Sequence, residues 1–136
     1  MKKILLIAGL LAVVFGSIGY YLYNKPLEDM ASAKTDITLQ ADELYTAYEA
    51  NETAANARFL DKKIQVTGKV LQVQTDQEGV VGVTLDAGGL LGGVLCKLDG
   101  LSEHKRTTFQ EGEEVTFKGI CTGMLMDVVV ERCIEL

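Results

Sequence analysis

An apolar segment at the N-terminus constrains this chain more than any other feature. The run covers residues 4–23, and the only charged groups ahead of it are Lys2, Lys3 and the terminal amine. About 20 residues of helix, rising about 1.5 Å each, cross the roughly 30 Å hydrocarbon core of a bilayer. Cations ahead of such a run hold the N-terminus in the cytoplasm. We therefore expect residues 1–23 to form a single-pass transmembrane anchor, with the C-terminal domain extracytoplasmic.

A cleaved secretory signal is the alternative interpretation of the same segment. Lys2 and Lys3 would then form the charged n-region, residues 4–16 the apolar h-region, and Ser17-Ile18-Gly19 the small-residue cleavage site. The run is longer than a typical h-region, which favours the retained anchor. A retained anchor would hold the domain in the periplasm or at the cell surface, whereas cleavage would leave a secreted domain. Both interpretations export the domain.

The charge of the exported part argues against nucleic acid as a partner. The chain has 13 basic and 19 acidic residues, and without Lys2 and Lys3 the balance is 11 to 19, a net charge of −8. Proteins that bind nucleic acid usually carry a basic face, because phosphate contacts supply most of the affinity. An acidic domain instead favours a protein, a peptide or a small envelope ligand.

Two short helices are predicted to open the domain. We expect residues 24–37 to form a linker and residues 38–136 the domain, beginning with Thr38 as the N-cap of a helix over 39–50. Asn51-Glu52 then breaks this helix and begins a second one that ends at Phe59.

Apolar side chains on the first of these helices predict how the helical pair packs. Leu44 and Tyr48 lie four residues apart, which places them on one face of a helix. We expect this face to pack the two helices onto the rest of the domain.

From Lys62 onward the hydrophobic period changes from 3.6 to 2, which indicates β-strands. Turn residues separate five predicted strands, at 62–73, 81–85, 94–98, 113–121 and 128–134. The first strand is long enough to bend, and the longest connection lies between the third and the fourth. This layout predicts a mainly β (α+β) domain, a five-stranded Greek-key barrel of the OB-fold type, preceded by two short helices and the transmembrane helix.

Short motifs along the domain carry a resemblance to a known family. They are Ala41, Leu44, Tyr48, Asn51-Glu52 and Ala57 in the helices, then Lys63-Ile64-x-Val66-x-Gly68-x-Val70, Val94-x-Cys96, Gly119-x-Cys121-x-Gly123, Asp127-Val128-Val129 and Cys133. This pattern resembles the tRNA-anti-like family of bacterial OB-fold proteins, which are commonly exported or lipid-anchored. The resemblance implies the OB-fold and an exported location. The chain departs from lipid-anchored members in having no lipobox cysteine.

Single-stranded nucleic acid remains the alternative ligand, motivated by this fold and family resemblance. OB-folds that bind single strands stack the bases on aromatic side chains, each base contributing about 1–3 kcal/mol. Between Lys62 and Leu98, which spans the first three predicted strands, the sequence contains no Phe, Tyr or Trp. The lack of stacking residues, together with the acidic charge, favours a protein or small-ligand partner.

The segment Met124-Leu125-Met126 is the candidate ligand-binding site. It lies in the predicted loop between the fourth and fifth strands, where OB-folds contact their ligands. Methionine side chains adapt to varied partners, and exposed apolar residues mark contact surfaces. The alternative is that the three side chains turn inward and close the end of the barrel.

Three cysteines, Cys96, Cys121 and Cys133, would lie in an oxidising compartment, where one disulfide can form. Cys121 and Cys133 flank the last predicted hairpin and are the candidate pair. The alternation of side chains argues against them, because Cys133 shares a face with Glu131 and Glu135. A β-bulge would remove this mismatch.

No residue pattern supports catalysis, a metal or a cofactor. Residues 88–93 are rich in glycine but lack the Lys-Ser/Thr ending of a phosphate-binding loop, and His104 is the only histidine. Glu111, Glu113 and Glu114 are expected to form a solvated turn. The sequence therefore predicts a non-enzymatic binding module.

Overall fold

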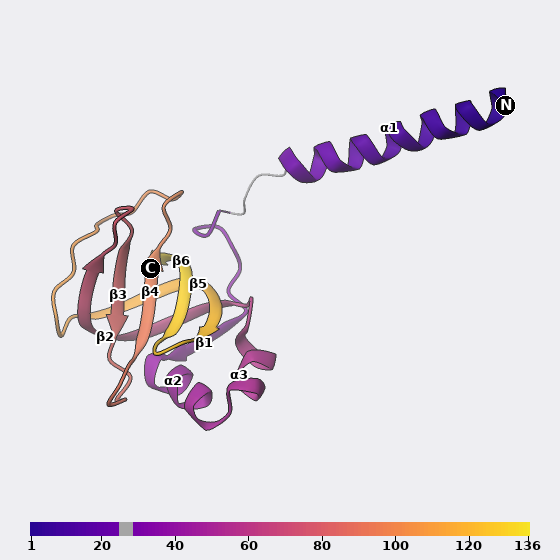
Figure 1. Cartoon of the computed structure of the whole chain (residues 1–136). Helices are drawn as coiled ribbons and strands as arrows, with labels where there is room; N and C mark the ends of the chain where they lie inside the picture. The colour runs from indigo at the N-terminus through magenta and orange to yellow at the C-terminus, as the bar shows by residue number, and fades with distance from the viewer. Residues whose placement is uncertain (25–28) are drawn as a thin grey trace.

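The computed structural model describes residues 1–24 and 29–136 of the chain. Figure 1 shows a β-barrel with two helices packed against one end, and the N-terminal helix projecting away from it. The elements follow one another as α1 (Lys2–Asn24), β1 (Ile37–Gln40), α2 (Ala41–Ala50), α3 (Glu52–Phe59), β2 (Lys63–Thr75), β3 (Val81–Leu85), β4 (Val94–Leu98), β5 (Glu114–Met124) and β6 (Val128–Glu135).

The barrel has the strand order of an OB-fold. Strands pair in the order β2-β3-β4-β6-β5, and β2 also pairs with β5, which closes the sheet. The pairings within this ring are antiparallel except for β4 with β6, which is parallel. A break in register between Val70 and Gln72 lets the long β2 leave β5 and join β3. The predicted five-stranded barrel is confirmed.

Helix α2 closes one end of the barrel with the face predicted from its spacing. Leu44 is 0% exposed and Tyr48 is 2% exposed, and both belong to the main hydrophobic core. The Tyr48 hydroxyl lies 3.4 Å from the Cys121 thiol on β5. Asn51 begins α3 as predicted, since its side chain accepts a hydrogen bond from the Ala54 amide.

The predicted start of the first helix is wrong. Thr38 lies within β1, a short strand that pairs in parallel with the first half of β2, Ile37 opposite Ile64. Asp36 starts this pairing, because its carboxylate accepts a hydrogen bond from the Lys63 amide. Helix α2 begins only at Ala41 and has no side-chain cap. The backbone pairing with β2 prevails over the capping preference of threonine.

The predicted linker is also too long. Residues 25–28 lie outside the described part, but from Asp29 the chain packs on the outer surface of β5 and β6. Met30 is 0% exposed and lies against Ile134. The ammonium group of Lys118 donates hydrogen bonds to the carbonyl oxygens of Ala31 and Ala33, at 3.2 and 2.8 Å. We call residues 29–36 the strap, because they fix the entry of the chain onto the barrel.

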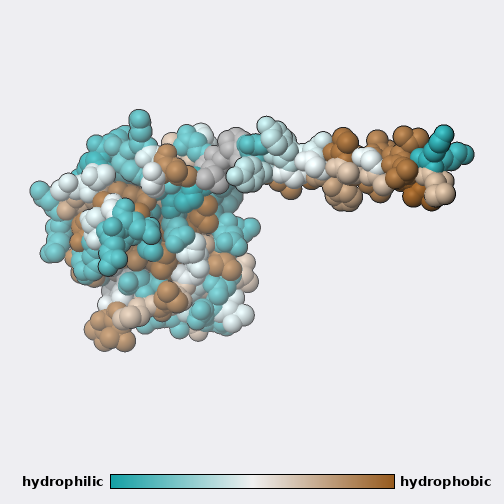
Figure 2. All heavy atoms as spheres, turned by 45° about the horizontal axis from the view of Figure 1, so that its top comes forward, coloured by the Kyte–Doolittle hydropathy of each residue, from teal (hydrophilic) through white to brown (hydrophobic). Residues whose placement is uncertain are grey.

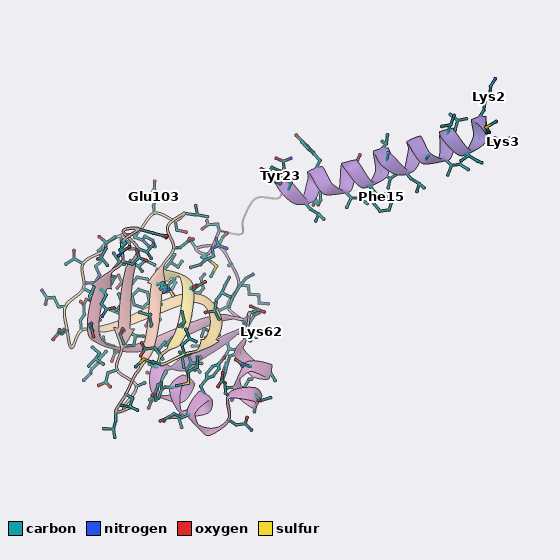
Figure 3. All side chains as sticks on the ribbon, in the orientation of Figure 1. Lys2, Lys3, Phe15, Tyr23, Lys62 and Glu103 are labelled. Atoms are coloured by element: carbon teal, nitrogen blue, oxygen red, sulfur yellow. The ribbon has the colours of Figure 1, made fainter. Side chains whose placement is uncertain are left out.

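Helix α1 has the dimensions of a membrane span. Its 23 residues have a mean hydropathy of 2.2 over the best window, and none is buried against the domain. Hydrophobic side chains cover much of the visible face of the outer part of the helix (Figure 2), with Lys2 and Lys3 at its free end and Tyr23 near the domain (Figure 3). A secretory signal near an N-terminus can have the same length and composition.

Candidate ligand-binding face of the barrel

The outer face of β2, β3 and β4 carries two rows of side chains that cross the three strands. The first row joins Gln72, Thr84 and Leu95, and the second joins Gln74, Gly82 and Lys97, each residue paired with the next across the sheet. In an OB-fold this is the face that contacts ligands. The sequence prediction placed the candidate site at the Met124-Leu125-Met126 loop instead and did not identify these residues.

Glycine makes this face concave. A side chain at Gly82 would lie 3.1 Å from the Leu95 methyl group, so Leu95 occupies the space that the glycine leaves free. A hollow of about 100 Å³ lies beside Gly82, and a second of about 290 Å³ extends over Gln72 and Thr84 to the loop with Leu90 and Leu91. Together they form a groove along the strands, which we call the strand groove.

The chemistry of the strand groove is amide, hydroxyl and aliphatic. Glutamine donates and accepts hydrogen bonds, as does the hydroxyl group of Thr84. Leu95 supplies an apolar wall, and Lys97 is the one cation among the described residues that line the two hollows. The same lining residues include no aromatic ring. The groove can therefore pair with polar groups of a ligand but offers no platform for stacked bases.

The predicted Met124-Leu125-Met126 site divides into an inward and an outward part. Met124 is half-buried and packs against the main core, whereas Leu125 is 89% exposed and Met126 is 73% exposed. The alternative, in which all three side chains turn inward and close the barrel end, therefore does not hold for Leu125 and Met126. Their role in ligand binding stays a prediction.

A second pair of exposed apolar residues lies beside this loop. Leu90 is 100% exposed and Leu91 is 85% exposed, both in the connection between β3 and β4. From the sequence, residues 88–93 are identified only as a glycine-rich segment, and these leucines are not singled out. We call Leu90, Leu91, Leu125 and Met126 the apolar crown.

Hydrogen bonds hold the two loops of the apolar crown together. The Asp127 carboxylate accepts a hydrogen bond from the Gly93 amide at 2.8 Å, and the Val128 amide donates to the Gly93 carbonyl at 3.0 Å. A side chain at Gly92 would lie 2.5 Å from the Met126 carbonyl oxygen. The glycines flanking the leucines are therefore needed for close contact between the loops.

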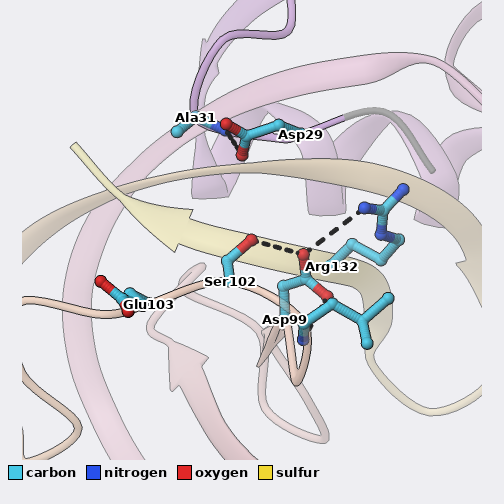
Figure 4. Close-up of a pocket in the computed structure, with 7 residues that line it drawn as sticks. Asp29, Ala31, Asp99, Ser102, Glu103 and Arg132 are labelled. Atoms are coloured by element: carbon cyan, nitrogen blue, oxygen red, sulfur yellow. Dashed lines mark hydrogen bonds and ion pairs between the residues drawn. The ribbon is translucent and has the colours of Figure 1, made fainter. Parts of the chain in front are cut away.

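A hollow of about 390 Å³ lies between the strap and the start of the β4–β5 connection (Figure 4). Its buried centre is Asp99, which accepts hydrogen bonds from the Ser102 hydroxyl and the Leu101 amide and faces Arg132 at 3.5 Å. Burial opposes ionisation of Asp99, but these hydrogen bonds and the Arg132 charge lower its pKa overall. Because these bonds shape the turn, we assign Asp99 a structural role.

His104 belongs to the same turn rather than to a reactive site. Its Nε2 atom lies 2.6 Å from the Asp99 carbonyl oxygen. Glu113 pairs with Arg106, and this ion pair lowers the pKa of the carboxyl group. Among the described residues, no three His, Cys, Asp or Glu side chains gather in a metal-binding arrangement.

The three cysteines are buried free thiols in this structure, so the Cys121–Cys133 disulfide considered from the sequence is not formed. The bulge considered as a remedy is present. Arg132 has a φ of 54°, and the register shift around it turns Cys133 into the core. Burial raises the pKa of Cys133, and the adjacent Cys96 thiol raises it further. Cys121 instead lies beside Tyr48.

Residues of the strand groove and the β3–β4 loop were missed for different reasons. Gln72 and Gln74 are the outward positions of an alternating strand, a pattern that the sequence displays but that also describes any solvated sheet face. Leu90 and Leu91 stand between two glycine pairs. That contrast is a usable signal, because two large apolar residues in a turn have no local reason to be there.

Comparison with solved structures agrees with the architecture. The chain is similar to the "putative nucleic acid-binding lipoprotein" of Klebsiella pneumoniae, with a TM-score of 0.59 and 13% sequence identity. The alignment covers 82% of this chain and 99% of the lipoprotein chain. At this identity the similarity shows the fold alone. A search of curated proteins finds none that matches.

The family comparison covers almost the whole sequence. The match includes residues 1–134, which contain both α1 and the OB-fold domain. The resemblance inferred from the motifs is thereby confirmed, and the chain belongs to the tRNA_anti-like family.

Proposed function

We propose that this protein is a membrane-tethered, non-enzymatic OB-fold module that binds a polypeptide outside the cytoplasm. The observation that carries the proposal is the strand groove, with its glutamine, threonine and leucine lining. An extended polypeptide matches this lining, because its backbone amides can pair with Gln72, Gln74 and Thr84 while an apolar side chain lies against Leu95.

Tethering by α1 is part of the proposal. A helix of 23 residues is about 34 Å long at about 1.5 Å per residue, enough to cross a bilayer. With α1 retained, the domain would be held near the membrane surface, since only four residues separate Asn24 at the end of the helix from Asp29 at the start of the strap. A reporter fused after Leu136 should be active only outside the cytoplasm, and the intact mass should include residues 1–23.

Single-stranded nucleic acid is the second candidate ligand, because the structurally similar Klebsiella protein is described as nucleic acid-binding. The groove favours the polypeptide. Among the described residues that line it, Lys97 is the one cation, and Asp76 and Asp127 lie at its two ends. Stacking and phosphate contacts together supply most of the affinity for single strands, and this face offers neither in quantity.

Photo-crosslinking in cells distinguishes the two ligands. A benzophenone amino acid would replace Thr84 in the groove of the full-length chain. Thr107, an exposed threonine on the β4–β5 connection, provides the matched control position. We expect an adduct from position 84 that protease digests and nuclease leaves intact, and a much weaker adduct from position 107. An adduct from position 84 that nuclease shortens would establish the nucleic acid alternative, and equal adducts from both positions would contradict a groove.

A further inference from the structure

The apolar crown lies at the end of the domain that α2 closes. Gly89 in the β3–β4 loop contacts the ring of Tyr45, because a side chain at Gly89 would come within 2.5 Å of that ring. The loop projects at the bottom of Figure 1, away from the strap and α1, and hydrophobic side chains project from the lower left of the domain in Figure 2. The crown therefore points away from the place where the chain enters the domain.

Rigid presentation distinguishes the crown from a flexible apolar loop. The Asp127 and Gly93 hydrogen bonds fix one loop to the other, and Tyr45 supports the base of the β3–β4 loop. A backbone that is already fixed loses little further conformational entropy when a partner covers its side chains, so only the side-chain rotamers must be ordered. Exposed apolar groups of this kind mark interaction surfaces.

The crown and the strand groove form one continuous surface. Leu90 and Leu91 line the same hollow as Gln72, Thr84 and Leu95. A ligand that lies in the groove and extends past Thr84 therefore reaches the crown.

Carboxylates lie near the base of the β3–β4 loop, on the side of α2. Asp42 and Asp86 line a common hollow with Gly88 and Glu114, and Lys69 is the one cation among its described lining residues. The domain as a whole carries a net charge of −8 outside the apolar segment. This charge repels anionic lipid and also a second copy of the domain.

We infer that the crown binds a segment of the polypeptide ligand in which apolar side chains are flanked by lysine or arginine. The apolar side chains cover Leu90, Leu91, Leu125 and Met126, and the basic ones face Asp42 and Asp86. This inference rests on the proposed function, because it names the chemistry of a ligand that also occupies the groove. Complementary charges at these carboxylates would mainly accelerate association and select the partner.

The test places the photo-crosslinking amino acid at position 91 of the full-length chain, with position 101 as the control. Leu101 is also a leucine in a loop and is 73% exposed, but it lies on the β4–β5 connection. We expect the adduct from position 91 to contain a polypeptide, with an apolar segment bordered by Lys or Arg at the crosslinked site. An adduct with lipid, with a second copy of this chain, or with an acidic segment would overturn the inference, as would equal yield from position 101.

Two variants test the parts of the surface separately, with the crosslinker at position 84. Leu90→Ser with Leu91→Ser should reduce the adduct about tenfold or more, and Leu101→Ser should leave it unchanged. Asp42→Asn with Asp86→Asn should reduce the adduct about threefold, because the two negative charges that would attract basic side chains are removed. Asparagine keeps the side-chain oxygen that accepts a hydrogen bond from a backbone amide at each position, so the local fold is preserved. An unchanged adduct in either double variant would contradict the inferred role of the crown in binding, but not the role of the strand groove. Absence of an adduct from position 84 in the chain without these substitutions would contradict the proposed function itself. Thermal melts of each variant show that it is folded.

Discussion

Individual side chains divide into those that hold the helices on the barrel and those that line the proposed binding surface. Leu44 and Tyr48 belong to the first group, and burial of Tyr48, with the Cys121 thiol beside it, raises the pKa of its hydroxyl. Gln72 and Leu90 belong to the second. The two groups can be separated by substitution, because residues of the second group are exposed.

Leu44→Ala should lower the free energy of unfolding by about 2–5 kcal/mol, because it removes buried methyl groups and leaves a cavity under α2. Urea unfolding of the full-length chain in detergent measures this change. Glu49→Ala on the exposed side of the same helix is the control and should change stability by less than about 0.5 kcal/mol. Similar small effects for both variants would show that α2 is not held by this face.

Asp99→Asn should destabilise the protein at neutral pH by about 1.5–3 kcal/mol, the usual range for hydrogen bonds to a charged group. Because the native pKa of Asp99 is lowered, its ionised form stabilises the fold above the unfolded pKa of about 4, and this is lost as pH falls through the native pKa. The stability difference between the two proteins should therefore shrink under acid conditions. A difference that is constant from pH 7 to pH 3 would mean that the carboxylate charge is not involved.

At the scale of elements, two features organise the domain around its binding face. The strap fixes one side of the barrel through Lys118, and the glycine contacts fix the two loops of the apolar crown at the other end. Both features join segments distant in the sequence.

Lys118→Met should release the strap. The substitution removes the ammonium group that holds the carbonyl oxygens of Ala31 and Ala33. Hydrogen bonds to a charged group contribute about 1.5–3 kcal/mol, so opening of the strap should become roughly tenfold to a hundredfold more frequent. Trypsin cleavage after Lys34, followed by mass spectrometry, measures this opening. Lys105→Met, at an exposed lysine, should not change the cleavage rate. Equal cleavage rates for the unaltered protein and both variants would show that Lys118 does not hold the strap.

Gly93→Ala should destabilise the loops of the crown by about 1–3 kcal/mol, as overpacking does. The added methyl group would overlap the Leu85 carbonyl oxygen, whereas Gly100→Ala meets no atom within 4 Å and serves as the control. Thermal melts of the two variants should therefore separate, with the Gly100 variant close to the unaltered protein. Coincident melts would indicate that the β3–β4 loop can move away from β3 without cost.

The sequence permitted prediction of elements more readily than of contacts between them. The period-2 alternation after Lys62 and the turn residues predicted the barrel, and Asn51 predicted the helix break. The cap predicted at Thr38 is wrong because strand pairing with β2 depends on a partner 27 residues away. The strap was missed for a similar reason, since its fixation depends on Lys118, far along the chain. The crown needed the pairing of two loops that no local pattern reveals.

For the whole molecule, the proposal separates architecture from ligand. The chain shares the OB-fold and the tRNA_anti-like family, while its groove has an amide and aliphatic lining. Its acidic charge and apolar N-terminal helix are consistent with a binding module held at a membrane surface. Binding of single strands therefore tests whether lining or architecture decides the ligand.

Fluorescence anisotropy of labelled single-stranded DNA and RNA, titrated with the full-length protein at several salt concentrations, provides this test. We expect no saturation up to about 100 µM protein at physiological salt, the weak end of the range for non-specific binding. A single-strand-binding OB-fold protein serves as the positive control. Micromolar affinity that weakens steeply as salt increases would contradict the proposal and assign the strand groove to nucleic acid.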